Sequence, residues 1–252
     1  MNTLLSWRSI AVLLFLEFLV GCSRGISPED CFDSKVQIEL LRATTRAEVD
    51  ILIGKGADIN ALGKNGVNAL IFSMMENNKN TFKSLLEAGA DPNLAALNGH
   101  AAIFYAAQHR EVWYLQEILK HGGNPNLVDF YIKNPSDSNA GRTPVYFSVH
   151  GLLPTHVKAL VAAGANLNFQ DKNGNTPALD AALINQYEMV YLLLSEGADP
   201  WVENRHGNTL AYPILHNGID PTSSNAAWRL KVIKLLKSKG MDVDAAIQNG
   251  KK

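Results

Sequence analysis

The chain has 252 residues, of which 46% are hydrophobic and 19% are charged. These proportions are those of an ordinary folded protein and exclude a collagen-like or extensively disordered chain. Its 23 lysines and arginines almost balance its 24 acidic residues. The chain as a whole therefore has no strong attraction to nucleic acid or to anionic lipid surfaces, and any such attraction must come from local patches.

The first segment has the features of an export signal. Arg8 gives a short positive region, and residues 10–20 form an apolar run too short to span a bilayer comfortably. The run ends in Leu19, Val20, Gly21 and Cys22, which resembles the lipobox of bacterial lipoproteins. The resemblance implies that residues 1–21 are removed and that Cys22 carries a lipid anchor. An ordinary signal peptide and a short anchor helix are the alternatives.

The residues after Cys22 are expected to form a tether over residues 22–33. Ser23 does not match the aspartate of an inner-membrane retention signal, so the resemblance favours the outer membrane, facing the periplasm, over the inner membrane. Cys31 is the remaining cysteine of the mature chain, so no disulfide framework is expected. This cysteine is interpreted as incidental, the alternative being a reactive or intermolecular thiol.

The rest of the chain is an array of internal repeats. Five similar endings recur at Gly56–Asn60, Gly89–Asn93, Gly122–Asn126, Gly164–Asn168 and Gly197–Trp201. The steps between their last residues are 33, 33, 42 and 33, so an insertion of 9 residues interrupts a constant period. A glycine follows six residues after each ending, except where the insertion delays it to Gly141. A period of 33 residues is that of ankyrin repeats.

A second motif supports the same frame. The segments Thr143–Tyr146 and Thr176–Leu179 read T-P-V-Y and T-P-A-L, which resemble the T-P-L-H that opens the first helix of an ankyrin repeat. Ile71, Phe104 and Tyr212 stand where that family usually has histidine. The resemblance implies an all-α ankyrin-repeat solenoid over residues 34–252, with about six helix–turn–helix units and short β-hairpin fingers.

Apolar pairs mark the second helix of each unit, and they are expected to face the neighbouring units. These pairs are Leu52 and Ile53, Leu85 and Leu86, Ile118 and Leu119, Leu160 and Val161, and Leu193 and Leu194. In the last unit the pair becomes Leu236 and Lys237, which indicates a solvent-facing cap. This unit also gains about 10 residues, placed between its helices around residues 218–227.

No catalytic or metal-binding motif is present in the sequence. There is no G-x-S-x-G, H-E-x-x-H or C-x-x-C, and Gly63 and Lys64 are followed by asparagine instead of the serine or threonine of a phosphate loop. His109, His150 and His216 fall at the ends of first helices but lack ligands at metal spacing. We therefore expect neither an enzyme nor a cofactor, metal or small-molecule substrate.

The ankyrin resemblance implies that finger tips and first-helix ends form a concave recognition face. The finger tips contribute Lys64, Asn65, Val67, Leu97, Asn98, His100, Arg142, Lys172, Asn173, Asn175, Arg205, His206 and Asn208. The helix ends contribute Met75, Glu76, Gln108, His109, His150, Leu183, Ile184 and His216, and the insertion adds Phe130, Tyr131 and Ile132. This mixture of amides, imidazoles and apolar groups suits a protein partner better than a nucleic acid. The alternative is that these residues are merely solvated.

A lipid anchor joined to a binding solenoid resembles the ankyrin-repeat lipoproteins that act as immunity proteins against type VI secretion phospholipase effectors. The resemblance implies a periplasmic protein that occludes a secreted phospholipase toxin. The alternatives are a periplasmic ankyrin-repeat protein that assists an oxidative-defence enzyme such as catalase, and an envelope scaffold.

Overall fold

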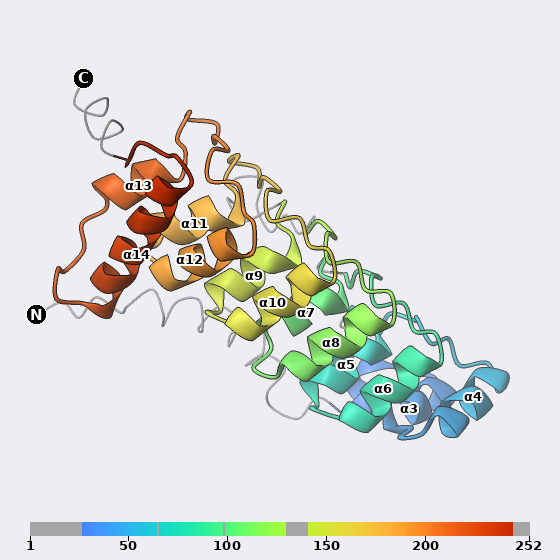
Figure 1. Ribbon diagram of the computed structural model, residues 1–252. Coiled ribbons are helices and arrows are strands. Elements are labelled where there is room, and N and C mark those ends of the chain that lie inside the picture. The colour runs from blue at the N-terminus through green and yellow to red at the C-terminus, as the bar shows by residue number, and fades with distance from the viewer. Residues whose placement is uncertain (1–26, 65, 98, 130–140, 244–252) are drawn as a thin grey trace, which may run out of the picture. The chain divides into compact units, whose positions relative to one another are not determined.

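The described part of the chain consists of helix pairs joined by short turns and extended fingers (Figure 1). The computed structural model describes residues 27–64, 66–97, 99–129 and 141–243. Six helix–turn–helix pairs lie within these ranges, and this confirms the expected solenoid. Two fingers each close with a single antiparallel bridge, Leu62 with Asn68 and Ala95 with Ala101, without a sheet in the described residues. The contacts divide the chain into two units, Met1–Asp91 and Pro92–Lys252.

The first unit holds two helix pairs and one short leading helix. The pairs are α3 (Lys35–Arg42) with α4 (Arg46–Gly54) and α5 (Ala69–Met75) with α6 (Lys79–Glu87). Helix α3 packs on α5, and α4 packs on α6. The leading helix, α2 (Pro28–Cys31), packs against α3. Cys31 is 1% exposed, so this part of the expected tether is folded, because the cysteine and the following phenylalanine bury apolar surface.

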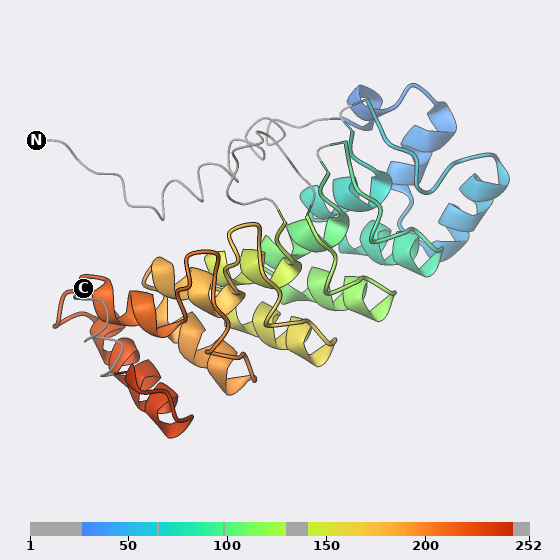
Figure 2. The ribbon, with the colours of Figure 1, turned by 90° about the horizontal axis from the view of Figure 1, so that it is seen from above.

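The second unit holds four helix pairs in two rows (Figure 2). The first helices are α7 (Ala102–Gln108), α9 (Pro144–His150), α11 (Pro177–Leu183) and α13 (Ala211–His216). The second helices are α8 (Val112–Lys120), α10 (Pro154–Ala162), α12 (Tyr187–Ser195) and α14 (Ser224–Ser238). Each helix contacts the next helix of its own row. The alanine pairs of α7 and α11 are fully buried, so small side chains let neighbouring helices approach closely.

The apolar pairs of the second helices are only partly buried. The first member is buried in every unit, whereas the second member is buried only at Leu86 and Leu194. Successive residues lie about 100° apart around a helix, so the second member turns away from the core. Lys237 is exposed, as expected for a cap, while its neighbour Leu236 is buried.

The extra residues of the last unit lengthen a helix as well as a loop. Helix α14 has 15 residues, against 9 for α12. The loop before α14 spans residues 217–223, whereas the loop before α12 spans residues 184–186. Six of the ten extra residues are therefore helical, and the expectation that all of them lie between the helices is wrong. The Ser223 hydroxyl accepts a hydrogen bond from the Ala226 N–H at 3.2 Å, and this cap lets the helix begin early.

The recurring asparagine at the end of each repeat has a structural role. Its Oδ1 accepts a hydrogen bond from a backbone N–H in the corresponding ending of the next repeat. The bonds are Asn60 with Asp91 at 2.9 Å in the first unit, and Asn93 with Asn124 at 2.7 Å, Asn126 with Asn166 at 2.7 Å and Asn168 with Asp199 at 2.8 Å in the second. We call these residues the asparagine ladder. At the fifth ending Trp201 takes the asparagine's place, and its side chain has no oxygen to accept such a bond.

Candidate protein-binding surface

The last two fingers of the second unit are built around short polar side chains, Asp171 and Asn204, that bond to their own backbone. In the finger of residues 169–176, Asp171 Oδ1 accepts hydrogen bonds from the N–H groups of Asn173 at 2.8 Å and Asn175 at 3.0 Å. Gly174 has φ +79°, and a Cβ there would lie 2.7 Å from the Arg205 nitrogen. Only glycine fits this turn, because it combines a left-handed backbone with close approach to the next finger.

Neighbouring fingers are hydrogen-bonded to each other. The Arg205 N–H donates to the Asn173 carbonyl at 3.1 Å, and the Asn204 side-chain amide donates to Asn175 Oδ1 at 2.9 Å. Gln170 Nε2 bridges the Gly174 carbonyl at 2.7 Å and the carbonyl of residue 203 at 2.8 Å. The last two fingers therefore present their tips from a fixed backbone.

The tip residues before each turn glycine are the more exposed ones. Leu97 is 74% exposed, Arg205 and His206 are exposed, and Lys172 and Asn173 are half-buried. In the first unit Lys64 is exposed and forms an ion pair with Asp33. Some expected binding residues lie outside the described residues: Asn65, Asn98, Phe130, Tyr131 and Ile132.

The residue after each turn glycine was expected to project into solvent, but its side chain is half-buried or buried. Val67, His100 and Asn208 are half-buried, and Arg142 and Asn175 are buried. The chain turns back at the glycine toward the start of the first helix, so this side chain packs under the finger. His100, for example, lies edge-on to Phe104 and Phe147, with ring centroids 5.7 and 5.9 Å away. Arg142 and Asn175 are therefore removed from the candidate surface.

Arg142 is the centre of a buried polar cluster that joins two repeats. Its Nη2 donates to Asp180 Oδ1 at 2.8 Å, and its Nε lies 3.7 Å from Asp171 Oδ2. The other oxygen of Asp180 contacts His150 Nε2. We call Arg142, Asp171, Asp180 and His150 the Arg142 cluster. Only His150 has a partly exposed side chain, so the cluster fixes this imidazole at the surface.

Burial controls the protonation of the groups around the cluster. Burial raises the pKa of Asp171, although the N–H groups of Asn175 and Asn173 and the Arg142 guanidinium oppose it. Burial, with the charges of Asp171 and Asp180, also raises the pKa of Tyr146. The Tyr146 hydroxyl donates to the carbonyls of Phe169 and Asn175, each at 2.6 Å. A tyrosine at the position of the family's histidine thus links two repeats.

A second imidazole is kept neutral by its surroundings. Burial lowers the pKa of His100 to about 4, which means that desolvation outweighs the attraction of the Asp129 carboxylate 3.6 Å from Nε2. His100 therefore contributes a neutral ring to the finger at neutral pH.

The row of first helices in the second unit is almost free of acidic side chains, lysine and arginine. Helices α7, α9, α11 and α13 contain one such residue, Asp180, and it is buried. Exposed or half-buried groups on this row are polar, aromatic or aliphatic: Tyr105, Gln108, His109, Phe147, His150, Leu183, Ile184, Tyr212 and His216. We call these residues the first-helix surface.

The C-terminal end of the first-helix surface is continuous across two repeats. Asn217 Nδ2 donates to the carbonyls of Ala182 at 3.1 Å and Leu183 at 3.3 Å, which fixes the end of α13 beside the end of α11. The Tyr212 and His216 rings stack with centroids 4.4 Å apart. Tyr212 is 44% exposed. The sequence motif suggested no role for it, although its spacing of four from His216 predicts the shared helix face.

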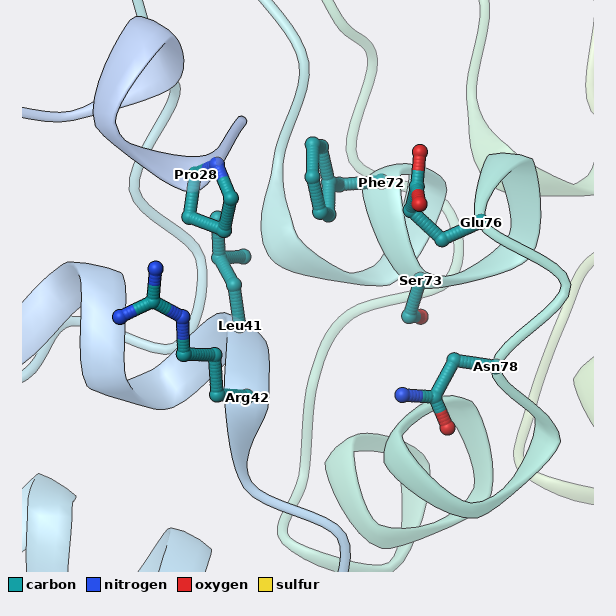
Figure 3. A pocket seen from close by; sticks show the side chains of 7 residues that line it. All are labelled: Pro28, Leu41, Arg42, Phe72, Ser73, Glu76 and Asn78. Carbon is teal, nitrogen blue, oxygen red and sulfur yellow. The ribbon is translucent and has the colours of Figure 1, made fainter. Parts of the chain in front are cut away.

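The first unit contains a shallow pocket of about 340 Å³ (Figure 3). Its lining consists of Pro28, Leu41, Arg42, Phe72, Ser73, Glu76 and Asn78. Glu76, expected at a helix end, is exposed at its rim, while neighbouring Met75 is half-buried. The Arg42 guanidinium is paired with Glu29, so the pocket has no free cation to attract an anionic ligand.

The described residues contain no group of three or more histidine, cysteine, aspartate or glutamate side chains placed to hold a metal ion. Within the same ranges no helix has the length and apolarity required to cross a membrane. Cys22 and the apolar run before it lie outside the described residues.

Comparisons with known proteins agree with the fold. The family model for ankyrin repeats (3 copies) matches residues 40–129 and 120–204. The structure is similar to that of EF0377, an ankyrin repeat protein, with a TM-score of 0.61 and 19% identity over 82% of this chain and 98% of the other. It is also similar to the ankyrin repeat domain of Bcl-3, a member of the IkappaB protein family, with a TM-score of 0.66 and 22% identity over 90% and 92% of the two chains.

A search of curated protein sequences found no match. The family model covers well over half of the chain, and both solved structures share its fold. The chain therefore belongs to the ankyrin-repeat family, whose repeats serve protein–protein interaction.

Proposed function

We propose that the protein is a lipid-anchored periplasmic immunity protein that binds and occludes a secreted phospholipase toxin of the type VI secretion kind. The observation that supports a binding role most directly is the first-helix surface, where histidine, aromatic and aliphatic side chains replace the charged groups found elsewhere. The cellular role rests on the resemblance of the segment ending at Cys22 to a lipobox and of the whole architecture to ankyrin-repeat lipoproteins.

The chemistry of the first-helix surface fits a folded protein partner. Charged residues are depleted and aromatic residues enriched at the centres of protein interfaces, where a few large side chains contribute most of the binding energy. Tyr212, Leu183 and Ile184 provide exposed apolar area. Arg205 and His206 at a finger tip provide polar groups at the edge. A nucleic acid would require a stripe of lysine and arginine along the row.

The proposed mechanism is stoichiometric occlusion. The first-helix surface and the finger tips cover the entrance to the toxin's active site, so phospholipid cannot enter. The lipid on Cys22 holds the protein at the membrane where the toxin acts and raises its local concentration there. No catalytic residue of this chain takes part, in agreement with the generally non-enzymatic role of ankyrin-repeat proteins.

The test takes a candidate phospholipase effector from the genes that neighbour the gene for this protein and measures its binding by calorimetry, together with its phospholipase activity. We expect a stoichiometric complex and complete inhibition. The variant Leu183→Ala with Tyr212→Ala should weaken binding at least about tenfold, or about 1.4 kcal/mol. The matched control is Lys158→Ala, an exposed residue of the second-helix row, which should bind normally.

Two results would contradict the proposal. One is the absence of any complex with a neighbouring phospholipase. The other is capture of an oxidative-defence enzyme such as catalase with an affinity that the same double variant abolishes, because the surface would then serve a different partner.

A further inference from the structure

The terminal helix α14 differs from the rest of the molecule in its charge. Between Asp220 and Asp242 the chain has no acidic residue. The same stretch contains five basic residues: Arg229, Lys231, Lys234, Lys237 and Lys239. The whole chain has a formal net charge of −1, so this segment is a local concentration of positive charge.

Aligning α14 with α12 shows where this charge lies. Both helices are followed by a turn glycine, Gly197 after α12 and Gly240 after α14. In this alignment Tyr187, Tyr191 and Leu194 of α12 correspond to Leu230, Lys234 and Lys237 of α14. Helix α12 packs on α14 (Figure 1), and Tyr191 contacts Trp228 of that helix.

The aligned residues are buried or half-buried in α12 but exposed in α14. Tyr187 is fully buried, whereas Leu230 is 67% exposed. Tyr191 lies beside Trp228 of α14, with ring centroids 5.6 Å apart, whereas Lys234 is exposed. The face of α14 that corresponds to a stacking face is thus open, and it carries Leu230, Lys234 and Lys237, with the exposed Lys231 at its edge. We call Leu230, Lys231, Lys234 and Lys237 the basic face.

The inner side of α14 is held firmly. Val232 and Leu236 are fully buried, and Arg229 Nη2 donates to the Leu215 carbonyl at 3.3 Å. The Lys231 ammonium lies 3.8 Å from the centroid of the Trp228 ring. The helix therefore presents the basic face from a rigid support instead of folding it inward.

A capping role alone does not account for this composition. A terminal repeat needs a polar outer face, and mixed charges provide one. The basic face has charges of one sign, spaced at i, i+3 and i+6, which places them along one side of the helix. It also leaves a large aliphatic side chain, Leu230, in solvent at its N-terminal end.

We propose that the basic face docks on an anionic lipid bilayer. Lysines near a bilayer surface are attracted by acidic headgroups, and an exposed leucine on the same face can enter the interface. Single-stranded nucleic acid is less suited, because it favours free aromatic rings for base stacking, and the Trp228 ring is already engaged by Tyr191 and Lys231. The inference depends neither on the toxin nor on the lipid at Cys22.

The test is flotation with vesicles of phosphatidylglycerol and phosphatidylcholine in equal parts, and with phosphatidylcholine alone. The protein is the expected mature chain, residues 22–252, with Cys22→Ser, so that neither the export signal nor an acyl chain contributes in any sample. We expect salt-sensitive binding to the anionic vesicles and little binding to the neutral ones. Lys231→Glu with Lys234→Glu should lower the partition coefficient at least about 25-fold, or about fivefold for each lysine.

The matched control is Lys120→Glu with Lys158→Glu, which makes the same change in net charge on exposed positions of α8 and α10. This control should reduce binding far less. Lys231→Gln with Lys234→Gln should give an intermediate loss of binding. This variant takes the place of the double glutamate variant if circular dichroism shows that the glutamate variant does not fold. Equal binding to both vesicle types, or equal losses in the basic-face and control variants, would overturn the proposal.

Discussion

Arg142 and its partners hold two repeats together through charge, in addition to the apolar packing of their helices. The guanidinium and the carboxylates of Asp171 and Asp180 are all buried. A buried ion pair contributes little net stability relative to an apolar replacement, but removal of one partner leaves an uncompensated charge. The cost of a substitution in this cluster therefore depends on whether the partner is changed as well.

Arg142→Met should destabilise the protein by about 3 kcal/mol, because Asp180 loses its 2.8 Å partner while it stays buried. Urea unfolding followed by circular dichroism measures this loss. Adding Asp180→Leu should restore a large part of it. Lys158→Met, at an exposed position, is the control and should change stability by less than about 0.5 kcal/mol. A double variant less stable than the single one would contradict this account.

His100 should make the protein sensitive to acid. Its pKa is lowered to about 4 in the folded state, while in the unfolded chain it stays near 6.5. As the pH falls below the pKa of His100 in the unfolded chain, the unfolded chain binds a proton there but the folded protein does not. Stability is therefore lost between about pH 6.5 and pH 4. At about pH 5 the loss from this group alone is about 2 kcal/mol.

His100→Leu should remove this contribution, so the difference in unfolding free energy between about pH 8 and about pH 5 should shrink by about 2 kcal/mol. Urea titrations at both pH values measure it. His206→Leu, at an exposed fingertip, should leave the difference unchanged. An unchanged acid response in the first variant would mean that Asp129 keeps the imidazole charged in the folded state.

Residue-level chemistry was the part least accessible from the sequence. The period located every finger, but it could not show that the residue after the turn glycine points inward, because this depends on the neighbouring finger. Arg142 was therefore placed at the surface, and Asp180, its partner 38 positions later, was not recognised. Cys31 likewise has no local signal for burial, since α3 covers it only after folding.

At the level of elements, the asparagine ladder explains why the repeat endings are alike. Each ladder residue accepts a hydrogen bond from a backbone N–H of the following repeat. Without the asparagine, that N–H in the connector would have no partner within the protein. Asn126, for example, accepts from the Asn166 N–H and donates to the Gly164 carbonyl at 3.0 Å. The helix side chains take no part in these bonds.

Asn126→Ala should lower the free energy of unfolding by about 2 kcal/mol, at about 1 kcal/mol for each of the two hydrogen bonds lost. Chemical denaturation measures the change. Asn80→Ala, at an exposed position within α6, removes the same amide without a ladder bond and should have little effect. Equal stability of the two variants would show that water replaces the ladder bonds at no cost.

The elements themselves were largely predictable. A constant spacing of 33 residues and the T-P motifs of the fourth and fifth repeats indicated both the helix pairs and their number. The lengthened α14 was not predicted, because the position of an insertion relative to a helix start depends on a cap, here Ser223. The T-P motif also could not show that Tyr146 would form the bond usually made by histidine.

For the whole molecule, the lipid anchor gives a clear expectation. Cys22→Ser should release the protein from the membrane fraction into the soluble periplasmic fraction, because an acyl chain is the proposed attachment. Cell fractionation with detergent extraction measures this. The basic face of α14 could leave a weak association, but it should be removed by high salt. Salt-resistant membrane attachment of the Cys22→Ser protein would contradict the lipobox interpretation.

The asparagine ladder has a consequence for how such a protein can change over evolution. The ladder asparagines lie in the connectors and bond to the backbone of the next connector. The exposed side chains of the first-helix surface lie on or at the ends of helices, so substitutions there leave the ladder bonds intact. Mutations that alter Leu183, Ile184 or Tyr212 can accumulate without the loss of stability that usually accompanies new specificity. A family of such proteins could therefore diversify its partners while the order and spacing of its repeats stay constant.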